Sequence, residues 1–364
     1  QNNILTFAKI RASYGTLGND LIGSNLYTSL LTGEAMYVFD NTLTAGTATG
    51  IITNPNVKWE EAKKFDVGVD LNFFNDEVTF VADYFVDTRT DLLIPNIPVS
   101  GILGGGAPGA GLPTINAGDV KNYGLELAIG YKKNLSDDFR IDVNYNVTFL
   151  KNKTTEVRNQ TGWLQSGNFG VGEAAARMEV GRPMGYFYGY RTDGIFQNQA
   201  EIDAAPSQTG LGSPVTQPGD IRFVDMNGDG VINANDKTEI GDPIPSATMG
   251  FNVNLQYKGF DFTAYAFASI GNDMLRNYER TVPNANRLNY VLDRWTGEGT
   301  SNTVPRATTG ATNNNVISDY FVEDGSFLRL KNLQLGYTFN PKLTQRAKIN
   351  SARISCCKNS LVIS

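Results

Sequence analysis

Strict alternation of apolar and polar residues constrains this chain most, and it is clearest in residues 139–149, FRIDVNYNVTF. Successive side chains of a β-strand point to opposite faces, so this segment predicts one apolar face and one polar face. The same alternation returns in residues 65–73, 123–131 and 251–257. Alternating segments of about ten residues are typical of strands in transmembrane β-barrels.

The lengths of the connections between the predicted strands also alternate. We predict strands at residues 5–14, 60–74, 78–87, 122–133, 139–150, 249–258, 260–270, 327–339 and 348–357. Long loops are predicted at about residues 15–58, 88–121, 151–246 and 271–325, the third of them mostly irregular, within one domain that covers residues 1–364. A slip in the alternation at Lys331 and Asn332 predicts a β-bulge. Short turns at one end and long loops at the other are the arrangement of outer-membrane barrels.

Composition removes several other classes of protein. The chain has no histidine, which excludes Ser-His-Asp and Cys-His catalysis and most zinc chemistry. Its formal net charge of −6 argues against a nucleic-acid partner. Cys356 and Cys357 are neighbours, and neighbours on a strand point to opposite faces, so we expect no disulfide between them. No enzymatic role is predicted.

Six stretches, in order along the chain, resemble one known family. They are IRASYGTLGN from Ile10, NPNVKWEEAKKFDVGVDLNFF from Asn54, INAGDVKNYGLELAIGY from Ile115, GYFYGYRTDGIFQ from Gly185, GDIRFVDMNGDGVINANDKTEIGDP from Gly219 and FLRLKNLQLGYTF from Phe327. Together they resemble the C-terminal part of a SusC/RagA-type TonB-dependent outer-membrane transporter.

The resemblance implies an all-β fold, in which this chain is the C-terminal segment of a transmembrane antiparallel barrel of about 22 strands. The plug domain of that family is absent from this chain, and we expect the chain to be an internal piece of a longer polypeptide with at least one further strand after Ser364. The implied function is active import of oligosaccharides or peptides across the outer membrane of a Gram-negative, Bacteroidetes-type bacterium. The implied partners are outer-membrane lipid, a SusD-like surface lipoprotein that acts as a lid, and TonB, through a region outside this chain.

An alternative reading is a secreted or surface β-protein that binds glycans and is stapled by calcium. Such a protein must bury its apolar strand faces against a second sheet. It would therefore be soluble without detergent, whereas a barrel segment would not.

Residues 225–236, DMNGDGVINAND, have the spacing of a calcium-binding loop. Oxygen ligands at positions 1, 3, 5, 7, 9 and 12 of such a loop suit a hard cation, and a glycine at position 6 permits its turn. The predicted ligands are Asp225, Asn227, Asp229, Val231 through its carbonyl, Asn233 and Asp236. The alternative is a turn that binds no metal, because Gly, Asn and Asp favour turns in any case.

Aromatic residues in the long loops are candidates for contact with a substrate. Tyr186, Tyr188, Tyr190, Trp163 and Trp295 could stack on sugars or peptides, or could simply pack within the loops. Arg177, Arg182 and Arg191 could face an anionic substrate or be solvated loop charges.

Overall fold

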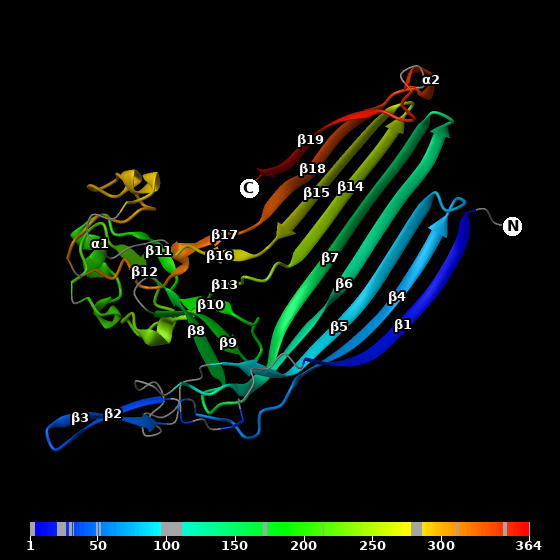
Figure 1. Ribbon diagram of the computed structural model, residues 1–364. Helices are drawn as coiled ribbons and strands as arrows, with labels where there is room; N and C mark the ends of the chain where they lie inside the picture. Colours follow the sequence, from blue (N-terminus) through cyan, green and yellow to red (C-terminus); the bar gives the residue numbers. More distant parts are fainter. Residues whose placement is uncertain are drawn as a thin grey trace.

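The main element of the fold is a nine-stranded antiparallel sheet (Figure 1). The computed structural model describes residues 4–19, 27–28, 31, 33–48, 50, 52–95, 111–169, 173–213, 215–277, 286–310, 312–344 and 348–363. Across the sheet the strands are β1 (Leu5–Asn19), β4 (Glu60–Phe73), β5 (Val78–Ile94), β6 (Ile115–Ser136), β7 (Phe139–Val157), β14 (Ala247–Tyr257), β15 (Phe260–Ile270), β18 (Phe327–Thr338) and β19 (Arg353–Ile363). All nine predicted strands are therefore confirmed.

The register of the sheet keeps apolar residues beside apolar residues. Val143 of β7 lies opposite Val253 of β14, and the next pair is Asn144 with Asn252. Because the side-chain period is two, this register places whole rows of one kind on each face. The large apolar side chains exposed on one face are Ile10, Tyr14, Phe65, Val67, Tyr84, Leu125, Ile129, Tyr131, Phe251, Tyr257, Phe260, Leu335 and Ile354. We call this face the outer face and the opposite, mostly polar one the inner face.

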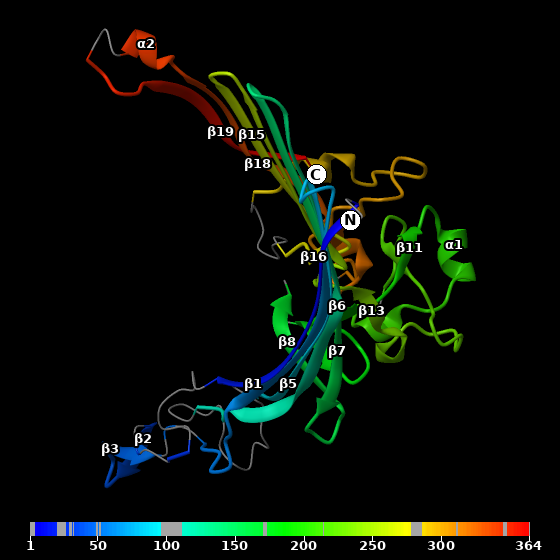
Figure 2. The ribbon, with the colours of Figure 1, turned by 90° about the vertical axis from the view of Figure 1, so that its right-hand side faces the viewer.

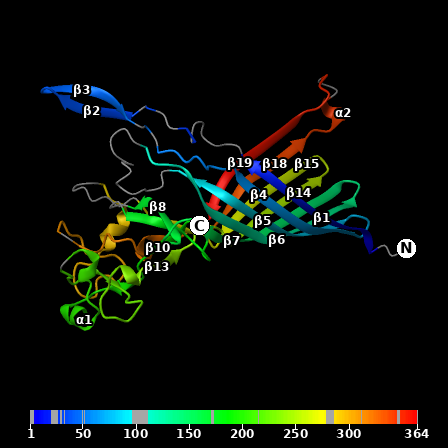
Figure 3. The same cartoon turned by 90° about the horizontal axis from the view of Figure 1, so that it is seen from below.

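Short turns join β4 to β5, β6 to β7 and β14 to β15 at one end of the sheet, and long connections lie at the other end, as predicted (Figure 1). The connection from β18 to β19 also lies at the short-turn end but is longer and contains α2 (Pro341–Thr344). Lys258 and Gly259 alone join β14 to β15, and Lys258 has a φ of 54°. The turn between β4 and β5 places Phe74, Asn75 and Asp76 at φ values of 55°, 56° and 65°. Left-handed backbone of this kind reverses a strand sharply. Seen from the side and from below, the sheet is strongly curved (Figures 2 and 3).

The predicted bulge is confirmed, while several strand ends differ from the prediction. Asn332 pairs with Tyr265 but Leu330 pairs with Ala266, which leaves Lys331 as the extra residue. The last strand spans Arg353–Ile363 rather than residues 348–357. Strands β5 and β6 extend into the predicted loop 88–121, because backbone pairing continues past the alternating segment. Where a strand begins and ends depends on its pairing with neighbouring strands, so the local sequence predicts these boundaries poorly.

The long connections carry secondary structure of their own, so the prediction that residues 151–246 are mostly irregular was wrong. A four-stranded sheet contains β13 (Thr238–Gly241), β10 (Tyr186–Gly189), β9 (Glu173–Glu179) and β8 (Trp163–Phe169), in that order. The same region holds β11 (Thr192–Ile195), β12 (Ile221–Phe223), α1 (Gln199–Ala204), and short 3-10 turns at Thr209–Leu211 and Ala234–Asp236. Strands of three or four residues are too short to show a period in sequence.

The remaining short elements lie in the other connections. They are the hairpin β2 (Gly33–Phe39) and β3 (Thr42–Ala48), the pair β16 (Asp273–Leu275) and β17 (Val322–Asp324), 3-10 turns at Asn289–Asp293 and Asp319–Phe321, and α2 (Pro341–Thr344). No helix in the described ranges is long and apolar enough to cross a membrane.

The described residues within 158–246 and 271–326 build a lobe at the long-loop end of the sheet, which we call the loop lobe (Figure 1). One of its cores contains Phe169, Ala175, Ile317 and Phe321, and a second contains Tyr190, Ile221, Phe223 and Ile232. A third cluster joins the large sheet to the lobe, because Val120 and Val157 pack with Met178 of β9. The lobe is thus anchored directly on the ends of β6 and β7.

Candidate functional site

The five aromatic residues predicted to contact a substrate do not form one surface. Tyr186 and Tyr190 are only 2% and 4% exposed, so neither ring is free to stack on a ligand in this conformation. Tyr190 packs edge-on against Phe223 in a lobe core, and Tyr186 donates a hydrogen bond to Glu179. Burial raises the pKa of Tyr190 to about 12 and also raises the pKa of Tyr186. Both rings are packed within the lobe, and their contact with a substrate stays a prediction from sequence.

Two of the other aromatics hold an arginine between them. The guanidinium carbon of Arg177 lies 3.3 Å from the ring centroid of Tyr188 and 4.3 Å from that of Trp163. Arg177 also pairs with Glu179 at 3.6 Å, and its side chain is 11% exposed. Cation–π contacts that are partly desolvated are favourable by about 1–2 kcal/mol. Arg177 is therefore a packed cation of the lobe rather than a solvated charge, and it fixes Trp163 and Tyr188.

The loop of residues 225–236 is closed by its last residue. Asp236 is fully buried, and its carboxylate accepts hydrogen bonds from the backbone N–H groups of Met226, Asn227 and Asn233. The carboxylate of Asp225 accepts from the N–H groups of Gly230 and Gly228, which hold its pKa below the usual value. Asp229 likewise accepts from the backbone of Val231.

Backbone hydrogen bonds hold the residue that the sequence predicts to close the calcium site. That residue is Asp236, whose Oδ1 accepts from two backbone N–H groups and whose Oδ2 accepts from one. Within the described ranges, no group of three or more His, Cys, Asp or Glu side chains is placed to hold a metal ion. The calcium ligand set remains a prediction from sequence, and the backbone bonds alone explain how the loop is held.

The inner face of the large sheet carries a network around Arg11. Its guanidinium pairs with Asp66 at 3.7 Å, Asp70 at 3.2 Å and Asp83 at 2.5 Å. Asp83 lies over Gly68, where an added Cβ would stand 1.8 Å from its Oδ1 atom. Gly68 is thus required for the carboxylate to reach Arg11. Arg11 thus joins carboxylates from β4 and β5 on the inner face.

Nearer the short turns, the inner face is hollowed into a polar cavity of about 440 Å³. Its charged lining residues are Arg140, Asp142, Asp261 and Arg353. Arg353 donates to both carboxylate oxygens of Asp261, at 3.1 and 2.5 Å. The two cations and two carboxylates balance, so this end of the inner face is polar without a dominant sign of charge.

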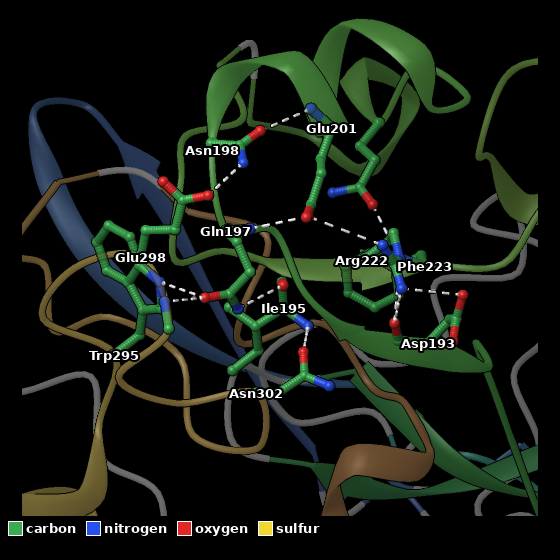
Figure 4. A network of polar contacts seen from close by, with 12 residues as sticks. Asp193, Ile195, Gln197, Asn198, Glu201, Arg222, Phe223, Trp295, Glu298 and Asn302 are labelled. Atoms are coloured by element: carbon green, nitrogen blue, oxygen red, sulfur yellow. Dashed lines mark hydrogen bonds and ion pairs between the residues drawn. The ribbon is translucent and has the colours of Figure 1, made fainter.

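A second cavity, of about 340 Å³, lies in the loop lobe. We call it the lobe pocket, and its lining residues are Ile195, Gln197, Glu201, Arg222, Gly299, Ser301 and Asn302. Ile195 ends β11, Glu201 lies in α1 and Arg222 lies in β12, while Gln197 lies between β11 and α1 and Asn302 lies on the second connection (Figure 4). Sequence reasoning missed this pocket, because its two halves are about a hundred residues apart and neither half carries a recognisable spacing.

Gln197 holds the two halves of the lobe pocket together. Its side-chain oxygen accepts from Nε1 of Trp295 at 3.2 Å and from the N–H of Gly299 at 2.9 Å. Its side-chain nitrogen donates to the carbonyls of Ile195 and Ser301. Both N–H donors and both acceptor lone pairs of this amide are therefore hydrogen-bonded. Trp295 is therefore a supporting residue beside the lobe pocket, and its role in substrate contact stays a prediction (Figure 4).

Comparison with known proteins places this architecture in a family. Residues 6–350 match the family model described as TonB dependent receptor-like, beta-barrel. The chain is 31% identical over 361 residues to TonB-dependent receptor P3 of Formosa agariphila, covering 97% of this chain and 34% of that protein. It is 29% identical over 370 residues to TonB-dependent receptor SusC of Bacteroides thetaiotaomicron, covering 100% of this chain and 35% of that protein.

A solved structure shows the same fold. The structure of the RagAB peptide transporter matches with a TM-score of 0.77 at 23% sequence identity, covering 100% of this chain and 38% of that chain. The chain thus spans about a third of the length of the relatives it matches. Large apolar side chains on its outer face, such as those of Ile10, Tyr14 and Phe251, are exposed, whereas the secreted alternative requires that face to be buried against a second sheet.

These relatives are receptors and transporters of the outer membrane of Bacteroidetes, not enzymes. The resemblance read from the six sequence stretches, the transmembrane barrel fold and the outer-membrane location are confirmed. With a family model matched over residues 6–350, the chain belongs to the β-barrel family of TonB-dependent receptors.

Proposed function

We propose that the protein carrying this chain imports nutrients, oligosaccharides or peptides, across the outer membrane, working with a SusD-like surface lipoprotein as a lid and drawing energy through TonB. The observation that supports this proposal is the two-faced wall of the large sheet. Its outer face is a continuous apolar surface suited to lipid, and its inner face carries the Arg11 network and the polar cavity at Arg353. A wall of this kind separates hydrocarbon from a water-filled interior.

The relatives support the choice of an energised importer over a passive pore. Two of them are named as TonB-dependent receptors, one of these is SusC, and the matching solved structure is named as a peptide transporter. The loop lobe adds a structured surface at the long-loop end, where a substrate and a lid would meet the barrel (Figure 1). In this proposal the chain contributes nine strands of the wall, and other strands, a plug and the contact with TonB come from other parts of the protein.

Uptake in cells tests the proposal. The gene for the full-length protein is deleted and restored in its host, and uptake of labelled oligosaccharides and labelled peptides is measured with and without TonB. The expected result is uptake of one of the two substrate classes that requires the gene, TonB and the neighbouring lipoprotein. Uptake that continues unchanged without TonB would contradict active import.

A further inference from the structure

The lobe pocket offers two hydrogen-bond donors from which no described residue accepts. Arg222 donates through Nε and Nη2 to the carbonyl of Asp193, at 3.0 and 2.6 Å. Its Nη1 atom has only a 3.8 Å ion pair with Glu201 and no hydrogen bond to any described residue. Asn302 accepts from the N–H of Ile195 through Oδ1, and its Nδ2 has no partner in the described part of the chain. Both donors belong to pocket-lining residues (Figure 4).

The same pocket offers one acceptor. Glu201 accepts from the N–H of Gln197 through Oε2, whereas its Oε1 accepts from no described residue. Its neighbour Asn198 caps the first turn of α1 by accepting from the N–H of Glu201, which fixes the start of this short helix. Glu201 is thus held by its backbone and by one oxygen, with the second oxygen left for a ligand.

Charge around the pocket argues against an ionic ligand. Arg222 is already offset by Asp193 at 3.1 Å and by Glu201 at 3.8 Å. An anion would gain little from Arg222 and would be repelled by Glu201, while an ammonium group would be attracted by Glu201 and repelled by Arg222. The pocket therefore favours a neutral ligand that both donates and accepts hydrogen bonds.

Hydroxyl groups meet this requirement best. Each hydroxyl carries one donor and two acceptor lone pairs on a single atom, so two adjacent hydroxyls can serve Nη1 of Arg222, Nδ2 of Asn302 and Oε1 of Glu201 together. A peptide amide places its donor and acceptor on separate atoms that point in opposite directions. The volume of about 340 Å³ is at the lower end for a ligand site, which suits one ring of a larger molecule.

We propose that the lobe pocket is a saccharide subsite, in which Arg222, Asn302 and Glu201 bind neighbouring hydroxyl groups of a neutral sugar ring. This inference rests on the proposed function and narrows it, because it selects oligosaccharides over peptides as the substrate class. Gln197 is a positioning residue in this subsite, because it fixes the segment that carries Gly299 and Ser301. Its amide oxygen and nitrogen are fully hydrogen-bonded to the protein and do not bind the ligand.

Two isosteric substitutions test the subsite. Asn302→Asp keeps the oxygen that accepts from Ile195 but replaces the free donor with an acceptor, and Glu201→Gln removes the charge while keeping an oxygen for Gln197. Glu323→Gln, at an exposed carboxylate on β17 outside the pocket lining, is the matched control. The detergent-purified full-length protein is applied to an array of neutral oligosaccharides with hexose, deoxyhexose and pentose ends, beside an array of capped neutral peptides.

The expected result is binding to a subset of the oligosaccharides, reduced tenfold or more by Asn302→Asp and by Glu201→Gln and unchanged by Glu323→Gln. Circular dichroism and hydrogen exchange of the lobe establish that each variant is folded. Binding to peptides only, binding to neither array, or wild-type affinity in both folded pocket variants would overturn the subsite. TonB-dependent uptake measured in the same variants separates the two ideas, since loss of TonB dependence defeats the proposed function whereas unchanged sugar affinity defeats only the subsite.

Discussion

Asp220 and Arg306 join the two long connections that build the loop lobe. The guanidinium of Arg306 donates to both oxygens of the Asp220 carboxylate, at 2.7 and 3.3 Å, across a separation of 86 positions. The side chain of Asp220 is 3% exposed and that of Arg306 is 17% exposed. Asn314 and the N–H of Gln217 donate to the same carboxylate. This buried pair joins the connection that carries Ile195 to Arg222 to the connection that carries Gly299 to Asn302, and the lobe pocket lies between these two.

Removal of the cation from this pair should destabilise the lobe. Arg306→Met leaves Asp220 buried with only neutral donors, and loss of one partner of a buried pair costs about 3–5 kcal/mol. Hydrogen exchange of the amides in residues 192–223 measures the free energy of local opening in the full-length protein. The matched control is Arg182→Met, which breaks the more exposed pair with Glu239 and should cost less than about 1 kcal/mol. Equal effects of the two substitutions would mean that the buried pair does not brace the lobe.

An added charge should cost more stability on one face of β7 than on the other. Val143→Arg places a cation on the outer face, where it costs about 2–4 kcal/mol if the residue lies near the bilayer midplane. Asn144→Arg places the same cation on the inner face, where water and the carboxylate of Asp142 can solvate it, so the cost should be much smaller. A refolding titration of the full-length protein into lipid vesicles measures both free energies. Equal costs would count against the assignment of the two faces.

The loop of residues 225–236 should depend on Asp236 more than on calcium. Asp236→Asn replaces an acceptor oxygen with a donor beside three backbone N–H groups, so we expect the loop to open and lobe stability to fall by about 1–3 kcal/mol. Removal of calcium with a chelator should leave the unfolding temperature unchanged. Asn235→Asp, at a residue outside the predicted ligand set, serves as the control. A rise in unfolding temperature with added calcium that disappears in Asp236→Asn would instead establish the ligand set predicted from sequence.

Alkaline pH should weaken the lobe through its buried tyrosines. The pKa of Tyr190 is about 12 in the folded protein, against a usual value of 10.0, because burial disfavours the tyrosinate. A raised pKa means that the unfolded chain releases its proton first, so stability is complete below pH 10 and falls as pH rises towards about 12. Urea unfolding of the lobe across this interval measures the loss. Tyr190→Phe has no phenol to titrate there, and its stability should fall less steeply; parallel curves for the two proteins would exclude Tyr190 as the cause.

The sequence by itself determined the large sheet. Alternation in segments such as residues 139–149 specifies a strand with one apolar face. Its register against the neighbouring strand follows because apolar residues of both strands must lie on the same face of the sheet. Even the bulge at Lys331 was visible, because one extra residue shifts the alternation. These features are local, or repeat with a period of two, and therefore can be read along the chain.

Tertiary structure alone decided the loop lobe and its pocket. Whether Tyr188 faced a ligand or packed on Arg177 depended on which strands paired with β9 and β10, and no local pattern carries that information. Asp236 has the sequence position of a metal ligand, and only the folded loop shows that its carboxylate also accepts hydrogen bonds from three backbone N–H groups. Arg222 and Asn302 are eighty positions apart and share a cavity because contacts such as the buried Asp220–Arg306 pair and the hydrogen bonds of Gln197 join the two connections. Contacts between distant segments depend on the packing of the whole lobe, which a periodic signal in one segment cannot encode.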